Sequence, residues 1–210
     1  MAPPARVPRD PADVRAQTGP PDGASRVRGA PRDAKTNAAA DTVILFEDES
    51  HVRAYQAIAA TWFLRGRQKQ VPTYGPQASV ALFGAVDIRS GTPGGEPAAD
   101  LTAQTFQAFL ARWFAQYPDQ PLVLICDNAK IPHAQCLAPF WAQYADAVEV
   151  WYLPAYSPNL NPTERLWKWL QQTVICNAFH PDIAAIVTSV EKFLAHVATV
   201  PEEVRSRLCA

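Results

Sequence analysis

The sequence lacks any apolar run near the roughly 20 residues that a membrane-spanning helix needs. Its first ten residues, MAPPARVPRD, contain no hydrophobic stretch of the kind that opens a secretory signal. The cysteines include no CxxC pair, and such scattered residues indicate free thiols in a reducing compartment (Cys126, Cys136, Cys176 and Cys209). These absences argue against a membrane protein or a disulfide-stabilised secreted protein, and they predict a cytoplasmic location.

The sequence also has little excess charge. Its formal net charge is −1, which does not indicate a nucleic-acid-binding protein by itself. The segment from His51 to Gln70 is different, because it carries four basic residues and no acidic one (Arg53, Arg65, Arg67 and Lys69). A local basic strip on a neutral domain is able to contact phosphates, although a solvated basic hairpin would look the same.

Large aliphatic residues are scarce in residues 1–40. After Met1 this segment contains only Val7, Val14 and Val27, among many Pro, Ala, Arg, Asp and Gly residues. Such a segment buries too little apolar surface to offset the entropy lost on ordering. We expect it to be disordered, or to result from a misassigned start or reading frame, and we expect residues 41–210 to form one folded domain.

Beyond Asp41, apolar runs typical of strands alternate with amphipathic segments typical of helices. Residues 55–74 are expected to contribute one hairpin strand, and RSGTPGGEP (89–97) is expected to be a turn. Asp100 or Thr102 would cap the first helix. The resulting order, β-β-β-α-β-α-β-α, predicts an α/β fold with a mixed central sheet covered by helices on both faces. The other expected strands are 43–46, 80–88, 122–126 and 148–152, and the expected helices are 101–117, 134–144, 160–173 and 181–197.

Three acidic residues stand at informative places in this order. Asp48 and Asp127 follow apolar runs that read as buried strands, and Glu164 lies at the start of a predicted helix. Carboxylates brought together repel one another, and a divalent cation with oxygen ligands relieves that repulsion. Two such ions activate a nucleophile and stabilise the leaving oxygen of a phosphodiester. The pattern predicts a metal-dependent enzyme that cleaves and joins DNA.

Each acid also has an ordinary explanation. Asp48 could belong to a solvated turn, because Glu47 and Glu49 flank it. Asp127 could mark a simple exit from a strand, and Glu164 could be a surface residue of a helix.

The sequence segments around these acids resemble those of a known family. The strings FEDES, WFLRGRQ, VALFGAVDIRSG, LVLICDNAKIPHA and WYLPAYSPNLNPTERLWKWL are similar to the DDE endonuclease domain of bacterial IS630 and Tc1/mariner transposases. The most discriminating string is LPAYSPNLNPTERLW, and the resemblance covers about residues 42–172. The segment WFLRG departs from the family's usual sequence at this place.

The resemblance implies a ribonuclease-H-like fold in which Asp48, Asp127 and Glu164 bind two Mg²⁺ or Mn²⁺ ions. It implies hydrolysis at a transposon end, followed by attack of the freed 3′-OH on target DNA, with a preference for TA. It further implies DNA as partner, a homodimer on that DNA and a nucleoid-associated location. Another ribonuclease-H-like nuclease and an inactive remnant remain as alternatives.

Further residues are candidates to support a metal ligand or to contact DNA, and the sequence leaves these two roles open (Glu49, Asn128, Lys130, His133, Arg65, Arg67, Lys69 and Lys168). Asn128 could equally shape a turn, and Pro132 precedes His133 where the family has no extra residue. Asn161 is expected to cap the helix that Pro162 opens. Trp167 is expected to pack in the core.

Members of this family normally carry helix-turn-helix modules ahead of the catalytic domain. Residues 1–40 do not resemble one. We therefore expect a truncated chain that works with an upstream helix-turn-helix polypeptide; a frameshifted element, a decayed gene and a misread start all explain this departure.

Overall fold

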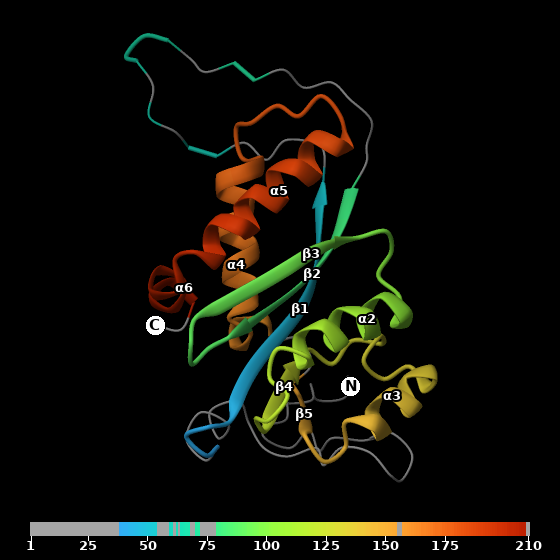
Figure 1. The fold of residues 1–210 in the computed structure, drawn as a ribbon. Helices are drawn as coiled ribbons and strands as arrows, with labels where there is room; N and C mark the ends of the chain where they lie inside the picture. Colours follow the sequence, from blue (N-terminus) through green and yellow to red (C-terminus); the bar gives the residue numbers. More distant parts are fainter. Residues whose placement is uncertain are drawn as a thin grey trace, which may run out of the picture.

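The computed structural model describes residues 38–53, 59–60, 62, 64–67, 70–71, 79–154 and 157–208. Its centre is a five-stranded sheet with the order β3-β2-β1-β4-β5 (Figure 1). The strands are β1 (Val43–Arg53), β2 (Ser79–Asp87), β3 (Thr92–Ala98), β4 (Leu122–Cys126) and β5 (Val148–Tyr152). The sheet is mixed, because β1, β4 and β5 are parallel whereas β2 is antiparallel to both β1 and β3.

Strand β1 is longer than the sequence indicates. The apolar run ends at Phe46, but the strand continues to Arg53 because β2 pairs with it over that whole length. Pairing with β4 stops earlier, at Phe46 and Ile125. The prediction that Asp48 sits at the tip of a strand is therefore wrong, since Asp48 lies within β1, just past the point where β4 ends.

The third strand is also not the predicted one. Thr92–Ala98 forms β3, although its sequence, TPGGEPA, was expected to be a turn. The described residues between β1 and β2 contain no strand, and the rest of the expected hairpin lies outside the described residues. The predicted order of strands and helices is confirmed, with β3 in place of the hairpin strand.

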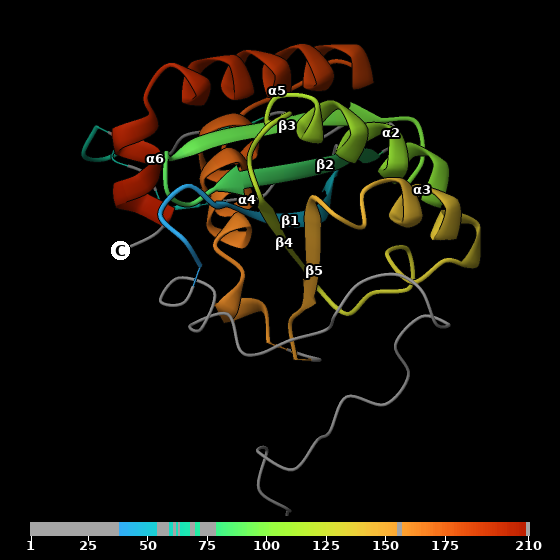
Figure 2. The ribbon, with the colours of Figure 1, turned by 60° about the horizontal axis from the view of Figure 1, so that its bottom comes forward.

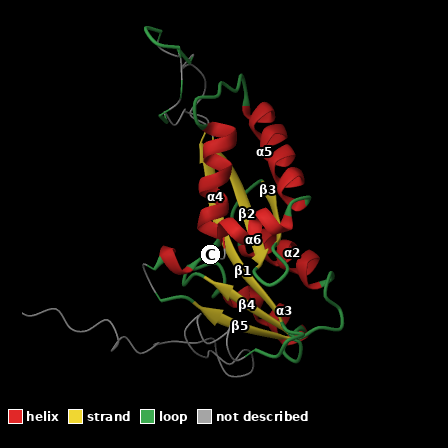
Figure 3. Cartoon of the chain, turned by 90° about the vertical axis from the view of Figure 1, so that its left-hand side faces the viewer, coloured by secondary structure: helices red, strands yellow, loops and turns green. Residues whose placement is uncertain are grey.

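Alternation along β1 divides the core into two parts. Ile44 and Phe46 point to the face that α4 (Thr163–Leu170), α5 (Ile183–Ala198) and α6 (Pro201–Leu208) cover. Val43 and Leu45 point to the face that α2 (Ala103–Phe114) and α3 (Ala138–Gln143) cover. In Figures 1 and 2, α2 and α3 lie together and apart from α4 and α6. Figure 3 shows α4 and α5 alongside β2 and β3. Apolar residues on both faces of β1 and β4 explain why these strands read as continuous hydrophobic runs.

The helices agree with the predicted segments to within a few residues, and α6 is an addition to them. The capping residue of α2 is Thr102, one of the two expected. A π-helical turn, Gln171–Ile175, directly follows α4. The helices are α2 (Ala103–Phe114), α3 (Ala138–Gln143), α4 (Thr163–Leu170), α5 (Ile183–Ala198) and α6 (Pro201–Leu208).

Among the described residues, no single helix is long and apolar enough to span a membrane. In the described part of the chain one pair, α5 and α6, reaches that length and composition when taken together, and the two helices are bent by 97° at their junction.

Residues 38–40, which precede the predicted domain boundary at residue 41, contact the domain. The guanidinium group of Arg89, just after β2, donates hydrogen bonds to the carbonyl oxygens of Ala38, Ala39 and Ala40 at 2.5–3.0 Å. These three residues are thereby attached to the domain beside the start of β1. The predicted disorder of residues 1–37 lies outside the described residues.

Candidate metal centre

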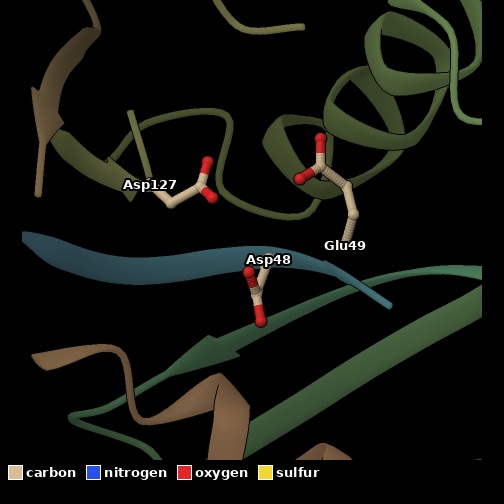
Figure 4. Close-up of side chains that lie close together, drawn as sticks. All are labelled: Asp48, Glu49 and Asp127. Carbon is tan, nitrogen blue, oxygen red and sulfur yellow. The ribbon is translucent and has the colours of Figure 1, made fainter. Parts of the chain in front are cut away.

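The acidic cluster lies where β1 extends past the end of β4. Asp48 and Glu49 belong to β1, and Asp127 directly follows β4. One carboxylate oxygen from each of the three lies within 4.8 Å of the others (Figure 4). Because β1 and β4 are parallel and adjacent, Asp127 leaves the sheet beside this part of β1, so Asp48 and Asp127 meet as expected.

Neighbouring residues of β1 leave the strand on opposite faces. Figure 4 shows the side chains of Asp48 and Glu49 pointing to different sides of β1, with Asp127 coming from the end of β4. Asp48 faces α4, where Trp167 contacts it, whereas Glu47 lies on the other face beside Cys126. The cluster therefore includes side chains from both faces of β1, and Asp127 lies close to Asp48 on one face and to Glu49 on the other.

Burial and mutual repulsion both act on these carboxyl groups. Burial raises the pKa of Asp48 to about 8, and the charges of Glu164, Asp127 and Glu49 add to this effect. Burial also raises the pKa of Glu49 to about 7, with a further contribution from Asp127. In both cases the charged form is destabilised. A bound cation would reverse that balance, so the metal-free site retains protons that a metal would displace.

Glu164 lies in the first turn of α4 and is exposed. Glu164 is not one of the three residues whose carboxylate oxygens lie within 4.8 Å of one another. Its charge is nevertheless the main cause, after burial, of the raised pKa of Asp48. The structure therefore brings the three predicted acids to one region and adds Glu49 as the third member of the tightest group.

Two hydrogen bonds fix the start of α4 against β1. The Nδ2 group of Asn161 donates to the backbone oxygen of Glu47 at 2.9 Å, and the hydroxyl of Thr163 donates to that of Phe46 at 3.0 Å. Pairing between β1 and β4 ends at Phe46, one residue before Glu47. The carbonyl oxygen of Glu47 therefore accepts its hydrogen bond from Asn161 and not from β4. The Oδ1 atom of Asn161 also accepts the N–H of Thr163 at 3.1 Å, which is the expected cap.

The donor set fits a hard divalent cation. Every potential ligand in the cluster is a carboxylate oxygen, the type that Mg²⁺ and Mn²⁺ accept. The Oε1 atom of Glu49 is buried and has no hydrogen-bond partner among the described residues. A cation would supply that missing partner, because it would coordinate the oxygen that the protein leaves unpaired.

The loop after β4 contains three of the other predicted residues. Asp127 Oδ1 accepts the N–H of Ala129 at 3.0 Å and so shapes the turn. Shaping this turn was one of the roles that the sequence left open for Asn128. Asn128 Oδ1 instead pairs with His133 Nε2 at 2.8 Å. The His133 ring lies 4.2 Å from that of Tyr152, and burial lowers its pKa despite the opposing charge of Asp127. Lys130 is exposed in this loop.

The remaining basic candidates lie elsewhere. Arg65 and Arg67 are exposed in the turn after Leu64, in the segment between β1 and β2. Lys168 is exposed on α4. Lys69 lies outside the described residues. The contacts of the described residues do not bring these side chains into the acidic cluster, and a role in binding DNA remains a prediction.

Sequence reasoning missed two neighbours of the cluster. Glu47 is 1% exposed, lies beside Cys126 and has an Oε1 atom with no partner among the described residues; burial raises its pKa well above the ordinary value. Trp167 packs in the core as expected, but its indole N–H also donates to Asp48 Oδ2 at 3.0 Å. Thr163 contacts β1, and Trp167 lies four residues later in the same helix. Residues four apart share one face of a helix, so this spacing was the sequence signal that Trp167 also faces β1.

The sequence profile of the DDE superfamily endonucleases matches residues 43–187, which include the whole cluster and α4. The chain belongs to this family. A curated relative, the uncharacterized 39 kDa protein of insertion element IS630 from Shigella sonnei, is 30% identical over 163 residues. That alignment covers 77% of this DDE-family chain and 47% of the relative, so the chain spans about half the length of the relative it matches.

Solved structures of the Mos1 transposase share the fold of this DDE-family chain. The pre-cleavage Mos1 transpososome aligns with a TM-score of 0.57 at 14% identity, covering 85% of this chain and 57% of that one. The Mos1 mariner paired-end complex with Mn aligns with a TM-score of 0.55 at 16% identity, covering 85% and 56%. The likeness confirms the predicted ribonuclease-H-like fold.

Proposed function

We propose that this DDE-family chain is the catalytic domain of a transposase that cleaves DNA at transposon ends and joins the freed ends to target DNA. The observation that carries the proposal is the gathering of carboxylate oxygens from Asp48, Glu49 and Asp127, with Glu164 at the adjacent start of α4. The Mos1 complexes with Mn and with Mg support divalent ions in this fold.

In this proposal Asp48, Asp127 and Glu164 hold two Mg²⁺ or Mn²⁺ ions. Such ions activate a nucleophile and stabilise a leaving oxygen. Asp127 approaches both Asp48 and Glu49, which leave β1 on opposite faces, and this position supports the proposal that it would be a ligand to both ions. The fixed start of α4 keeps Glu164 in the region of Asp48, so that the carboxylates that would hold the ions are near one another before DNA binds.

The proposed chemistry consists of two displacements at phosphorus. Water attacks the phosphorus at the transposon end, the bond to the 3′ oxygen breaks, and the products are a 3′-OH and a 5′-phosphate. The 3′-OH then attacks a phosphodiester of the target, we propose at TA, and displaces the target's own 3′ oxygen. Neither step requires a covalent bond between protein and DNA.

The length of the IS630 relative supports a proposal about partners. That protein is about twice as long as the aligned part, so we propose that recognition of the transposon ends requires a helix-turn-helix polypeptide together with this domain. We further propose that the domain acts as a homodimer on DNA and resides in the cytoplasm at the nucleoid. The basic side chains of Arg65, Arg67, Lys69, Lys130 and Lys168 are proposed to contact phosphates.

The first test combines metal binding with cleavage. Thermal unfolding of the whole chain is measured with and without Mn²⁺, and nicking of supercoiled plasmid is measured in Mn²⁺ and in chelator. Wild type should melt at higher temperature with Mn²⁺, since a ligand at about 100 times its Kd adds about 2.7 kcal/mol of stability. It should also nick plasmid only with metal.

Asp127→Asn should lose both responses. Asp119→Asn is the matched control, because it makes the same change at an exposed turn and should retain both. A wild type without metal response would contradict a preformed metal site. Nicking without joining of a pre-cleaved 3′ end, in the presence of the complete DNA-binding partner, would favour a hydrolytic nuclease of the same fold.

A further inference from the structure

One side chain outside the predicted triad makes direct contact with it. The indole N–H of Trp167, on α4, donates a hydrogen bond to Asp48 Oδ2 at 3.0 Å. Both residues are 7% exposed, so water does not compete strongly for this bond. The bond occupies Oδ2, and the other carboxylate oxygen of Asp48 takes no part in it.

Gly84 makes this contact possible. It is the β2 residue that pairs with Asp48. A Cβ atom at this position would lie 2.4 Å from both Cζ2 and Cη2 of Trp167, which is far closer than two carbon atoms approach without bonding. The absence of a side chain therefore lets the indole ring lie against β2 directly beside Asp48.

The same face of α4 is attached to β1 one turn earlier. Thr163, four residues before Trp167, donates its hydroxyl hydrogen to the backbone oxygen of Phe46 at 3.0 Å. Asn161 donates to the backbone oxygen of Glu47 at 2.9 Å. Phe46, Glu47 and Asp48 thus each accept one hydrogen bond from α4 or the residues that lead into it, and the indole has little freedom to move away from the carboxylate.

Packing alone does not account for this arrangement. Trp151 is another buried tryptophan, and its Nε1 atom has no hydrogen-bond partner among the described residues. Burial in this core therefore does not by itself direct an indole N–H to an acceptor. At Trp167 the acceptor is the carboxylate of Asp48 in the acidic cluster, and the β2 residue that pairs with Asp48 is a glycine.

We propose that Trp167 is a positioning residue that holds Oδ2 of Asp48 and thereby leaves the other oxygen oriented for a divalent cation. This role rests on the proposed function, because it presupposes that Asp48 binds metal. Groups that hold a metal ligand in place typically change metal affinity 10–100-fold when they are removed.

The test measures Mn²⁺ binding to the whole chain by calorimetry for wild type, Trp167→Phe and Trp169→Phe. Phenylalanine retains an aromatic ring but has no N–H. Trp169 is the matched control, because it lies on the same helix but packs on Phe193 and under Arg207 instead. We expect Trp167→Phe to weaken Mn²⁺ binding about 10-fold or more, and Trp169→Phe to bind within about twofold of wild type.

A second measurement uses the folded wild type and so does not depend on the stability of Trp167→Phe. The indole N–H resonances are followed by ¹⁵N-¹H NMR, with assignment through bonds. The Trp167 resonance should shift when Mg²⁺ is added and in the variant Asp48→Asn, whereas the Trp169 resonance should shift much less. A selective response would show that the indole N–H contacts Asp48 in solution, and the calorimetry then shows whether this contact supports metal binding.

The outcomes separate the two proposals. A wild type that binds neither Mn²⁺ nor Mg²⁺ would overturn the metal site and, with it, this role of Trp167. Metal binding in Trp167→Phe that equals wild-type binding would overturn the positioning role alone, and so would a Trp167 resonance that does not respond to Mg²⁺. Weaker binding in Trp167→Phe only, with a selective shift of the Trp167 resonance, would support it.

Discussion

Asn161 links α4 to the sheet through two hydrogen bonds, one to β1 and one to the first residue of α4, and Asn161→Ala removes both. Its Nδ2 group donates to the backbone oxygen of Glu47 at 2.9 Å, and its Oδ1 atom accepts the N–H of Thr163 at 3.1 Å. Asn161 is 3% exposed, so water cannot readily replace these bonds. Alanine therefore leaves one buried carbonyl oxygen and one N–H without partners.

The expected loss can be estimated from these two groups. A buried acceptor left unpaired costs about 1–3 kcal/mol, and loss of a capping side chain costs about 1 kcal/mol. We therefore expect Asn161→Ala to lower the free energy of unfolding by about 2–4 kcal/mol, out of the roughly 5–15 kcal/mol of a typical domain. Urea denaturation of the metal-free chain measures this difference directly.

Two variants make the comparison sharper. Asn159→Ala changes an exposed asparagine two residues earlier and should cost less than about 0.5 kcal/mol. Asn161→Asp retains the acceptor for Thr163 but loses the donor to Glu47, and it places another carboxylate near the cluster. Its stability should therefore fall further as the pH rises. If Asn161→Ala is no less stable than Asn159→Ala, the attachment of α4 to β1 does not depend on these bonds.

Three further predictions concern stability. Because the pKa of Asp48 is raised to about 8 and that of Glu49 to about 7, the folded protein holds more protons than the unfolded chain from about pH 4 to pH 8. The metal-free protein should accordingly lose stability as the pH rises through that window, and thermal melts in chelator should show a shallower loss for Asp48→Asn; equal slopes would contradict the raised pKa of Asp48. Gly84→Ala should cost about 1–3 kcal/mol in urea denaturation, because its methyl group would displace the Trp167 ring; a neutral result would mean that the ring moves freely. Arg89→Met should lower the melting temperature by roughly 2–4 °C, since about 1 kcal/mol is lost with the hydrogen bonds to the residues before β1; an unchanged melting temperature would show that this attachment contributes nothing.

Strand β3 shows where sequence patterns failed for the fold. Its two glycines and two prolines are rare in strands, so TPGGEPA reads as a turn. The reason for the glycines lies in segments distant in sequence. A Cβ atom on Gly94 would lie 2.6 Å from the Trp113 ring of α2, and one on Gly95 would lie 3.0 Å from the backbone oxygen of Phe83. Such packing requirements are visible only once the helices are in place.

The candidate site was predictable to a greater extent. Adjacent parallel strands bring Asp48 and Asp127 together, and the string around Glu164 indicates the helix that lies beside them. Glu49 was harder to place, because alternation along β1 directs it to the opposite face from Asp48. Its approach to Asp127 depends on β4 ending where β1 continues, and local sequence does not reveal that difference in strand length.

The prolines of β3 restrict how copies of this domain can associate. In an antiparallel pair, alternate residues direct their N–H groups to the neighbouring strand and to the open side. A proline has no N–H to give β2, so Pro93 and Pro97 occupy positions that face outward, together with Gly95. Of the N–H groups along the open edge of β3, only that of Gly95 remains. An added strand would find no continuous ladder there, so the open edge of β3 does not support joining of the sheets of two copies.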